Sequence, residues 1–471
     1  MTDRRRVVLV VFDGLRRDRV SPALTPALDR FRQASTDFPL SRTVFPSETR
    51  VAVSSLVTGH YPGDHGIVAN AFVSRSAGRI RTARLADLER LSVARGGRLL
   101  QRPSLGEILA SAGRRMAVVS TATPGATHLL NHRAAELGHV TISTFGAEAC
   151  QPAAALDAAV AHAGPVPAGA FPNTARLDWA VDVLLDHLVP TLDPDLSILW
   201  LSDPDSTWHY RGIGSPEGVA ALAGADAAFA RVLARADAQP EGQRPTILVM
   251  SDHGHISARE TVDLPALVDA VFPEAEHQPG YSGGLSLTVP NGDARADMAR
   301  WLLEQPWCGH VITRGGDGAV GLVPGSFDRR LVGCDHPDAP DIYYILATDD
   351  GCDGHGIRGS CLFHNEIPVG GSMHGGLHPH EMANVLIVGG AGARAGRCSP
   401  LPAGTVDVAP TILTLLGVDG ADAMAGRVLA EAFNVDVSSA VEPSMETVSS
   451  GSRLLRYWRL GDLRYLDAAL P

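Results

Sequence analysis

The chain has 471 residues, and 45% of them are hydrophobic, which is enough to bury a large core. Its formal net charge of −12 argues against broad binding to nucleic acid or to an anionic membrane, because both attract basic surfaces. The sequence contains no lysine, so arginine must supply the basic contacts to an anionic ligand.

The first predicted element is a strand over residues 7–12, a β-branched run typical of strands buried on both faces of a parallel sheet. The run follows three arginines, but it is short and ends in Asp13-Gly14, so we interpret it as a strand rather than a signal peptide. No other stretch is long enough to cross a bilayer. These features predict a cytoplasmic protein.

Two helices are predicted next. Residues 25–34 favour a helix with Thr25 as its N-cap and Pro26 at its first position. Residues 51–58 favour a helix of small residues that ends at Gly59, with Thr49 at its N-terminal side.

Three further predicted strands, over residues 196–201, 246–250 and 384–389, end in polar residues or glycines. Helices predicted over 177–188 and 219–236 precede the first and the second of these strands. This alternation predicts the α/β class, with a mostly parallel central sheet flanked by helices. In such a sheet the ligand crevice lies at the carboxyl ends of the strands, where the polar residues stand.

Two stretches interrupt this alternation. Residues 72–105 are rich in arginine and weakly patterned, and residues 257–340 contain a predicted helix over 294–304 and a predicted strand over 319–323. We interpret the second stretch as an inserted cap subdomain near the crevice. The predicted division is a discontinuous core of residues 1–256 and 341–435, a cap of 257–340 and a C-terminal extension of 436–471.

None of the six cysteines forms a CxxC pair, so we expect reduced thiols rather than a disulfide framework in a chain of this length. One pairing in a loop, between Cys352 and Cys361, stays open at this point.

Acidic and histidine side chains follow the predicted strands and converge on one edge of the sheet. The candidate metal ligands are Asp13, Asp205, His209, Asp252, His253 and His374. Their oxygen and nitrogen donors suit Zn²⁺, with Mn²⁺ as the alternative. Six ligands are too many for one tetrahedral ion, so they predict two divalent ions, a device that promotes phosphoryl transfer.

Thr49 is the candidate nucleophile. It stands at the N-terminus of the predicted second helix, where free N–H groups and the helix dipole favour an anionic ligand. A threonine hydroxyl activated by a metal can attack phosphorus without a protein general base.

At these positions the sequence resembles the alkaline phosphatase superfamily, in particular its type I phosphodiesterase/nucleotide pyrophosphatase family. The matching segments are Val-Phe-Asp-Gly at Asp13, Pro-Asp-Ser-Thr-Trp-His at Asp205, Ser-Asp-His-Gly at Asp252, and the nine-residue spacing from Thr49 to Thr58-Gly59. Residues 406–417 match the tail pattern of the superfamily. The resemblance covers most of the core and little of residues 72–195 or 257–340.

The resemblance implies an alkaline-phosphatase-like fold and a division of the ligands between two ions. It assigns Asp13, Thr49, Asp252 and His253 to one ion, and Asp205, His209 and His374 to the other. It also implies that Thr49 forms a phosphothreonine, which water then hydrolyses, and that Asn70 holds a phosphoryl oxygen.

Arg50 departs from the family pattern, which usually has phenylalanine after the nucleophile. An arginine there could bind a phosphoryl oxygen or a second anionic group of the substrate, or it could pair with Glu48 or Asp64. Related phosphonoacetate hydrolases bind their carboxylate with lysine, which this chain lacks.

Other polar and aromatic residues near the motifs also have ordinary structural interpretations. Five of them are predicted loop histidines, one of which could line the pocket: His255, His355, His364, His378 and His380. Asp203 is predicted to support a turn or a ligand. Trp208 and Tyr210 are predicted to pack in the fold rather than to stack on a leaving group.

The sequence therefore predicts a two-metal phosphodiesterase that acts on small phosphoryl esters through Thr49. Two alternatives stay open: a phosphonate or phosphate monoester hydrolase of the same superfamily, and a non-catalytic metal-binding protein. The expected partner is a small phosphoryl or phosphonate ester, not a nucleic-acid polymer or a membrane, and a homodimer is compatible with the sequence.

Overall fold

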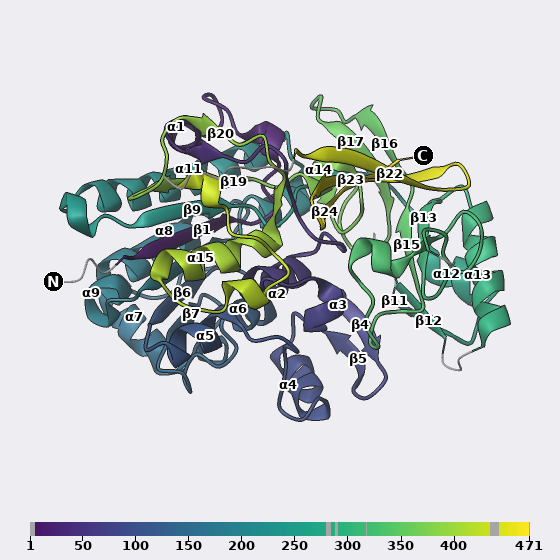
Figure 1. Ribbon diagram of the computed structural model, residues 1–471, viewed down its shortest axis with the longest axis horizontal. Coiled ribbons are helices and arrows are strands. Elements are labelled where there is room, and N and C mark those ends of the chain that lie inside the picture. The colour runs from purple at the N-terminus through teal and green to yellow at the C-terminus, as the bar shows by residue number, and fades with distance from the viewer. Residues whose placement is uncertain (1–4, 279–283, 288–290, 317, 434–441, 471) are drawn as a thin grey trace.

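The centre of the larger part of the molecule is a twisted sheet with helices on both faces (Figure 1). The computed structural model describes residues 5–278, 284–287, 291–316, 318–433 and 442–470, and within them this sheet has eight strands. From edge to edge these are β20 (Arg397–Cys398), β2 (Thr36–Asp37), β19 (Leu386–Gly390), β9 (Thr246–Met250), β1 (Val7–Phe12), β8 (Leu196–Leu201), β6 (Met116–Ser120) and β7 (Val140–Ser143).

The strands from β9 to β7 run parallel to one another, whereas β19 is antiparallel to β9. The predicted α/β class with a mostly parallel sheet is thereby confirmed. Strands β1, β8 and β9 have the predicted bounds, and β19 begins two residues later than predicted.

The alternation of side chains along β1 builds two separate cores. Leu9 and Val11 pack on the face covered by α2 (Thr49–Thr58), α5 (Leu105–Ser111), α6 (Pro124–Leu130) and α15 (Val408–Leu416). Val10 and Phe12 pack on the opposite face, against α1 (Pro26–Ala34), α8 (Thr174–Asp182) and α11 (Pro216–Asp237). Because successive side chains of a strand point to opposite faces, an all-apolar strand such as β1 must lie between two layers of helices.

The predicted helices are present with small changes at their ends. Helix α1 has Thr25 as its N-cap, and α2 begins at Thr49 and ends before Gly59, which adopts φ 67°. The helix predicted over 177–188 is α8 followed by a π-helical segment, η3 (Val183–Leu188). Further short elements are α3 (Pro62–His65), α7 (Ala155–Ala163), α9 (Val189–Leu192), α10 (Asp205–Arg211), α12 (Leu264–Asp269), α14 (Pro379–Met382), β3 (Ser41–Arg42) and β21 (Ala403–Gly404).

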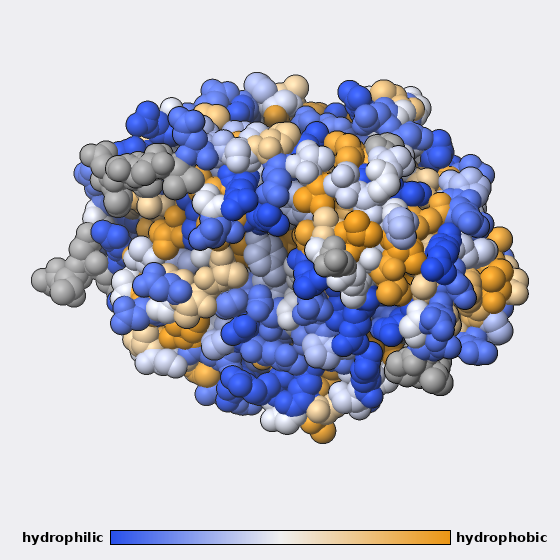
Figure 2. Space-filling view, turned by 45° about the vertical axis from the view of Figure 1, so that its right-hand side comes forward, coloured by the Kyte–Doolittle hydropathy of each residue, from blue (hydrophilic) through white to orange (hydrophobic). Residues whose placement is uncertain are grey.

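Smaller sheets lie beside the central sheet, on the right in Figure 1. One contains β11 (Ala275–Gln278), β12 (Gly284–Leu287), β15 (Ile342–Leu346), β13 (Cys308–Thr313) and β14 (Phe327–Asp328), and it packs against α13 (Gly292–Glu304). Another contains β16 (Thr348–Cys352), β17 (Arg358–Phe363), β10 (Ile256–Thr261) and β18 (Ser372–Met373). Hydrophobic residues gather on this side of the molecule, as the right-hand side of Figure 2 shows.

These sheets extend beyond the predicted cap, because β15, β16 and β17 follow residue 340 and pair with strands that precede it. The division of the chain into core, cap and extension stays a prediction. The prediction of a strand over residues 319–323 is wrong. Val320 makes only an isolated bridge with Phe327, because the chain turns back where the Gly321 N–H donates to the Ser326 carbonyl.

The segment that was weakly patterned in sequence forms a hairpin of β4 (Ala71–Ser74) and β5 (Gly78–Arg81), followed by α4 (Leu85–Ala94). The C-terminal residues form an antiparallel sheet of β22 (Ser444–Ser450), β23 (Arg453–Leu460) and β24 (Leu463–Leu470).

All six cysteines lie among the described residues and carry free thiols, so Cys352 and Cys361 do not pair. Across the described ranges, every helix is too short or too polar to cross a membrane. The cytoplasmic location stays a prediction.

A buried carboxylate connects two of the helices that cover the sheet. The side chain of the N-cap residue Thr25 accepts no hydrogen bond from the first N–H groups of α1. Asp226 of α11 supplies the acceptors instead, since its two oxygens accept the N–H groups of Ala27 at 2.9 Å and Leu28 at 2.8 Å. Asp226 is buried, so these hydrogen bonds are shielded from water.

We expect Asp226→Ala to lower the free energy of unfolding by about 2–4 kcal/mol, because it leaves two buried N–H groups without acceptors. Urea unfolding followed by far-UV circular dichroism measures the change. Asp237→Ala, at the exposed C-terminal end of the same helix, is the control and is expected to change stability by less than about 0.5 kcal/mol. Equal effects of the two substitutions would contradict the capping role.

Candidate metal centre and catalytic threonine

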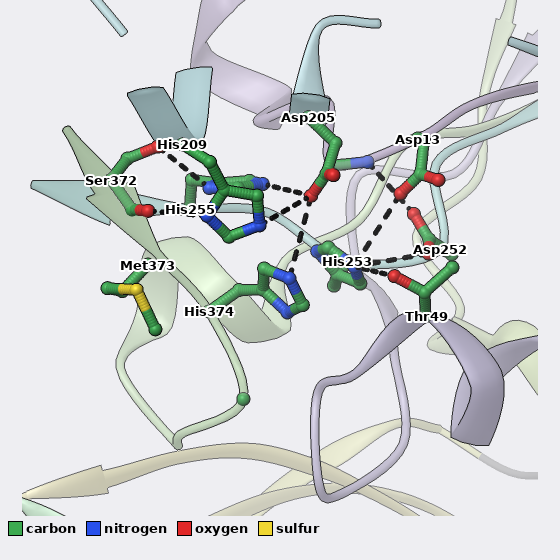
Figure 3. A network of polar contacts seen from close by, with 12 residues as sticks. Asp13, Thr49, Asp205, His209, Asp252, His253, His255, Ser372, Met373 and His374 are labelled. Atoms are coloured by element: carbon green, nitrogen blue, oxygen red, sulfur yellow. Dashed lines mark hydrogen bonds and ion pairs between the residues drawn. The ribbon is translucent and has the colours of Figure 1, made fainter. Parts of the chain in front are cut away.

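The site lies at the carboxyl ends of β9, β1 and β8, which are neighbours in the central sheet with β1 in the middle. Asp13 follows β1, Asp205 follows β8, and Asp252 follows β9. Each strand ends where its apolar run ends, so the first polar side chains beyond the sheet emerge side by side. The structure brings together all the predicted metal ligands and Thr49 (Figure 3).

Asp13 and Asp252 each have one oxygen held by the protein and one oxygen without a hydrogen bond. Oδ2 of Asp13 accepts the indole N–H of Trp200 at 2.8 Å, and Oδ1 of Asp252 accepts the N–H of Gly14 at 2.9 Å. The other oxygen of each carboxylate is buried and lacks a donor. Buried carboxylate oxygens without donors are costly, and a bound cation satisfies them.

Three imidazoles are held with Nε2 facing the carboxylates. Nδ1 of His253 donates to the Gly254 carbonyl at 3.1 Å, Nδ1 of His209 to the Ser372 carbonyl at 2.7 Å, and Nδ1 of His374 to the Ser47 carbonyl at 2.8 Å. A carbonyl can only accept, so each neutral ring carries its proton on Nδ1 and leaves Nε2 as a lone pair. This is the tautomer that a metal ligand requires.

The donor atoms fall into two groups that meet at Asp205. Oδ1 of Asp205 lies 3.3 Å from Nε2 of His209 and 3.5 Å from Nε2 of His374. In the other group, Nε2 of His253 lies 3.1 Å from Oδ2 of Asp252 and 3.8 Å from Oδ1 of Asp13. Within the described residues, ligand atoms of Asp205, His209, His255 and His374 lie within 4.8 Å of one another, and so do those of Asp13, Asp205 and His253.

Burial and the neighbouring charges act on the ionisation of these groups. Burial, together with the carboxylates of Asp252 and Asp205, raises the pKa of Asp13 well above its ordinary value. Burial also acts to raise the pKa of Asp205, but the imidazoles of His209 and His255 hold it well below its ordinary value. Burial and neighbouring imidazoles lower the pKa of His374, so this ring is neutral. The carboxylates repel one another, and cations at this position remove that repulsion.

Thr49 is the first residue of α2, and its side chain is buried beside the second group. Its Oγ1 lies 3.2 Å from Nε2 of His253, so with this ring protonated on Nδ1 the hydroxyl donates a hydrogen bond to Nε2. Ser47, two residues earlier, is tied to the loop of His374 because its Oγ accepts the N–H of Gly375 and donates to the Gly376 carbonyl. The threonine hydroxyl is thus fixed relative to both groups of candidate ligands.

Asn70 and Arg50 line the same cavity as Thr49. Oδ1 of Asn70 accepts the N–H of Arg50 at 3.2 Å, which leaves the Nδ2 amide as the donor for a ligand. Nε of Arg50 donates to Oγ1 of Thr82 at 3.3 Å, so the guanidinium is oriented by this contact. Burial lowers the pKa of Arg50, while the nearby carboxylates of Glu48 and Asp13 act to raise it.

The cavity above these residues measures about 580 Å³, a size that admits a small organic ester. Its walls include Gln278, Gly284 and Pro340 from the segment predicted as a cap. A larger cavity of about 840 Å³ lies elsewhere, between the loop that precedes α2 and the C-terminal strands, and contains none of the candidate ligands.

Some of the flanking residues differ from their predicted roles. His255 lies in a loop, as the sequence predicted, but its ring is fully buried among the candidate ligands. The only feature of the sequence that pointed to this location was its position two residues after His253. Trp208 packs in the core as expected, and its N–H donates to the Gly218 carbonyl. Tyr210 lines the cavity instead, against the ring of Phe171 at 5.0 Å between centroids.

Asp203 has the supporting role expected of it. Its carboxylate accepts the N–H of Asn173 at 2.7 Å and the N–H and hydroxyl of Thr207, in the first turn of α10. It therefore orients the helix that carries Asp205 and His209.

Comparison with known proteins identifies similar chains. Residues 7–300 match the sequence model of the family described as "Type I phosphodiesterase / nucleotide pyrophosphatase". No curated protein sequence matches the chain.

Two solved structures of murine ectonucleotide pyrophosphatase/phosphodiesterase 5 are similar in fold. One is the protein itself (TM-score 0.61), and the other is an inactive variant in complex with AMP (TM-score 0.60). Each shares 16% sequence identity, and the alignment covers 88% of this chain and 96% of the other.

The indole of Trp200 allows a test of the candidate metal centre. We expect Trp200→Phe, which removes the N–H donor to Asp13 together with the pyrrole part of the buried indole, to weaken Zn²⁺ binding by about 10- to 100-fold, as is usual when a group that orients a ligand is lost. Competition with a chelating dye measures the affinity. Trp179→Phe is the matched control, since that indole donates to the Gly164 carbonyl away from the site. Unchanged affinity in Trp200→Phe would argue against Asp13 as a ligand.

Proposed function

The chain belongs to the type I phosphodiesterase/nucleotide pyrophosphatase family and is a phosphoric ester hydrolase, and on that premise we propose that it cleaves phosphodiesters with two divalent ions and Thr49. The observation that carries this proposal is a cluster of a buried threonine hydroxyl, three carboxylates and imidazole lone pairs, of which Thr49, Asp205, His209 and His374 line one cavity. The two buried carboxylate oxygens without donors, on Asp13 and Asp252, support the presence of cations there.

We assign the ligands to two ions by their grouping. One ion would be held by Asp13, Thr49, Asp252 and His253, and the other by Asp205, His209 and His374. Bound divalent cations would lower the pKa of the Thr49 hydroxyl and stabilise negative charge on the phosphoryl oxygens. Zn²⁺ suits this set of oxygen and nitrogen donors best, and Mn²⁺ is the alternative.

Thr49 then acts as the nucleophile. Its Oγ1 loses a proton and forms a bond to phosphorus, while the bond from phosphorus to the leaving oxygen breaks and the leaving alcohol takes up a proton. Water attacks the phosphothreonine in a second step, the bond from phosphorus to Oγ1 breaks, and the threonine hydroxyl is restored. The products are one alcohol and one phosphate monoester.

Two donors in the cavity would bind the phosphoryl group. The Nδ2 amide of Asn70 is held by the hydrogen bond at its other end, and the guanidinium of Arg50 is a permanent cation within the same cavity. Both are directed by contacts to the protein, so little ordering is required when negative charge develops on the phosphoryl oxygens. The N–H groups at the start of α2 add to this stabilisation.

The walls of the cavity favour an aromatic or other planar group on the ester. Phe145, Phe171 and Tyr210 are 41%, 41% and 42% exposed, and all three line the cavity. Exposed rings at a cavity mouth bury apolar area when a planar group stacks on them. The AMP bound by the similar murine protein carries such a ring, so we propose a nucleotide-like or aryl phosphodiester as the substrate class.

Removal of the nucleophile tests the mechanism. We expect Thr49→Ala to lower kcat with bis-p-nitrophenyl phosphate by more than ~10³-fold, as is usual when a nucleophile is lost, while two metal ions per chain remain. Release of p-nitrophenolate and elemental analysis are the measurements. Ser54→Ala on the same helix is the control, because its hydroxyl donates only to the Arg50 carbonyl. Substantial turnover by Thr49→Ala would rule out the covalent route, and faster turnover of p-nitrophenyl phosphate by wild type would favour a monoesterase.

The role of Arg50 has a separate test. We expect Arg50→Gln to lower kcat/KM for bis-p-nitrophenyl phosphate by about 10- to 100-fold, the loss of one charge-assisted hydrogen bond. Arg300→Gln, at an exposed position on α13, serves as the control. If Arg50→Gln changes kcat/KM as little as Arg300→Gln does, Arg50 does not contact the phosphoryl group.

A further inference from the structure

His255 is a fourth imidazole at the metal centre, and the family resemblance gives it no role. Its side chain is fully buried, directly after the Ser-Asp-His-Gly segment. The ring centroid lies 4.9 Å from those of His209 and His374. Figure 3 shows it beside Asp205, on the side away from Asp13.

The hydrogen bonds of His255 differ in kind from those of the other three rings. Nδ1 of His255 lies 2.9 Å from Oγ of Ser372, a hydroxyl, whereas Nδ1 of each other ring donates to a carbonyl. A hydroxyl can donate as well as accept, so His255 can carry its proton on Nε2. The protein therefore holds three rings in the tautomer of a metal ligand and leaves the fourth able to be a donor.

The distances from Asp205 to the neighbouring rings also distinguish His255 from the candidate ligands His209 and His374. Nε2 of His255 lies 2.8 Å from Oδ1 of Asp205, the length of a charge-assisted hydrogen bond. Nε2 of His209 and Nε2 of His374 lie 3.3 Å and 3.5 Å from the same oxygen. Two ligands at about 2.0–2.1 Å from a tetrahedral ion are roughly 3.3 Å apart, which fits the two longer distances and not the short one.

The backbone before α1 makes room for this ring. Gly14 adopts φ 69°, and a Cβ built there would lie 2.4 Å from Nε2 of His255. The same glycine donates its N–H to Asp252. Gly14 therefore both leaves space for His255 and holds one oxygen of Asp252. Asp205, the partner of His255, belongs to both groups of donor atoms.

We propose that His255 is a positioning residue that donates Nε2–H to Oδ1 of Asp205, while the Ser372 hydroxyl donates to its Nδ1. The hydrogen bond occupies one lone pair of Oδ1 and fixes the carboxylate, so that the remaining lone pairs of Asp205 face the metal. The inference rests on the proposed metal centre. It predicts that His255 governs the affinity of the ion held by Asp205, His209 and His374 without being one of its ligands.

Metal titration of the full-length protein and its variants tests this role. We expect His255→Ala to weaken binding of the ion at Asp205 by about 10- to 100-fold. His255→Gln, whose side-chain amide can donate to the same oxygen, is expected to recover most of that loss. His364→Gln is the control, because that ring donates to the Val262 carbonyl outside the centre. A loss in His255→Gln equal to that in His255→Ala would overturn the proposal.

The visible absorption spectrum of the protein loaded with Co²⁺ distinguishes a positioning residue from a ligand, because its intensity follows the coordination of the metal. We expect His255→Gln to keep the wild-type spectrum, and a changed spectrum would show that His255 is a ligand. Should His255→Ala fail to fold, as judged by near-UV circular dichroism of the metal-free protein, Ser372→Ala replaces it and should weaken the same ion. Wild type is measured first: fewer than two bound ions would refute the metal centre itself.

Discussion

The mutual repulsion of three carboxylates at the end of the central sheet is the constraint on which the site depends. Asp13, Asp205 and Asp252 follow neighbouring strands, and their charges are concentrated where the apolar strands end. Trp200 donates a hydrogen bond to one oxygen of Asp13, and Gly14 donates one to an oxygen of Asp252. Imidazoles surround the carboxylate of Asp205. One buried oxygen each of Asp13 and Asp252 has no donor from the protein, and the proposed cations would satisfy both.

The surrounding backbone fixes the orientation of the candidate ligands. Carbonyls of Ser47, Gly254 and Ser372 accept the Nδ1 protons of three histidines, and each carbonyl belongs to a different segment of the chain. Ser372 contributes twice, with its carbonyl to His209 and its hydroxyl to His255. The segments that orient these histidines therefore come from the end of the central sheet, from the chain just before Thr49, and from one of the smaller sheets. The candidate centre forms only when these parts pack together.

Under the proposed function, phosphoryl chemistry and substrate choice fall to different parts of this molecule. The chemistry resides at the strand ends, which a long apolar core holds rigidly. The cavity walls come from parts outside the central sheet: the hairpin after Asn70, the loop that carries Phe171, and the segment that includes Pro340. Arg50 lies between the two, next to the nucleophile and within the cavity, and it replaces an aromatic ring with a cation. The proposed substrate would place a planar group and a second anionic oxygen against this wall.

Local pattern in the sequence determined the strands over 7–12, 196–201 and 246–250, the helix that begins near Thr49, and the types of residue that stand at the strand ends. These features follow from apolar runs and caps within a few residues of one another, so one sequence contains them. The strand expected over 319–323 failed, because a tight turn overrode its β-branched residues. The role of His255 was likewise hidden, since it depends on Asp205 and Ser372, which lie 50 and 117 residues away in the chain. Only tertiary packing brings those partners to one ring and decides which nitrogen of that ring carries the proton.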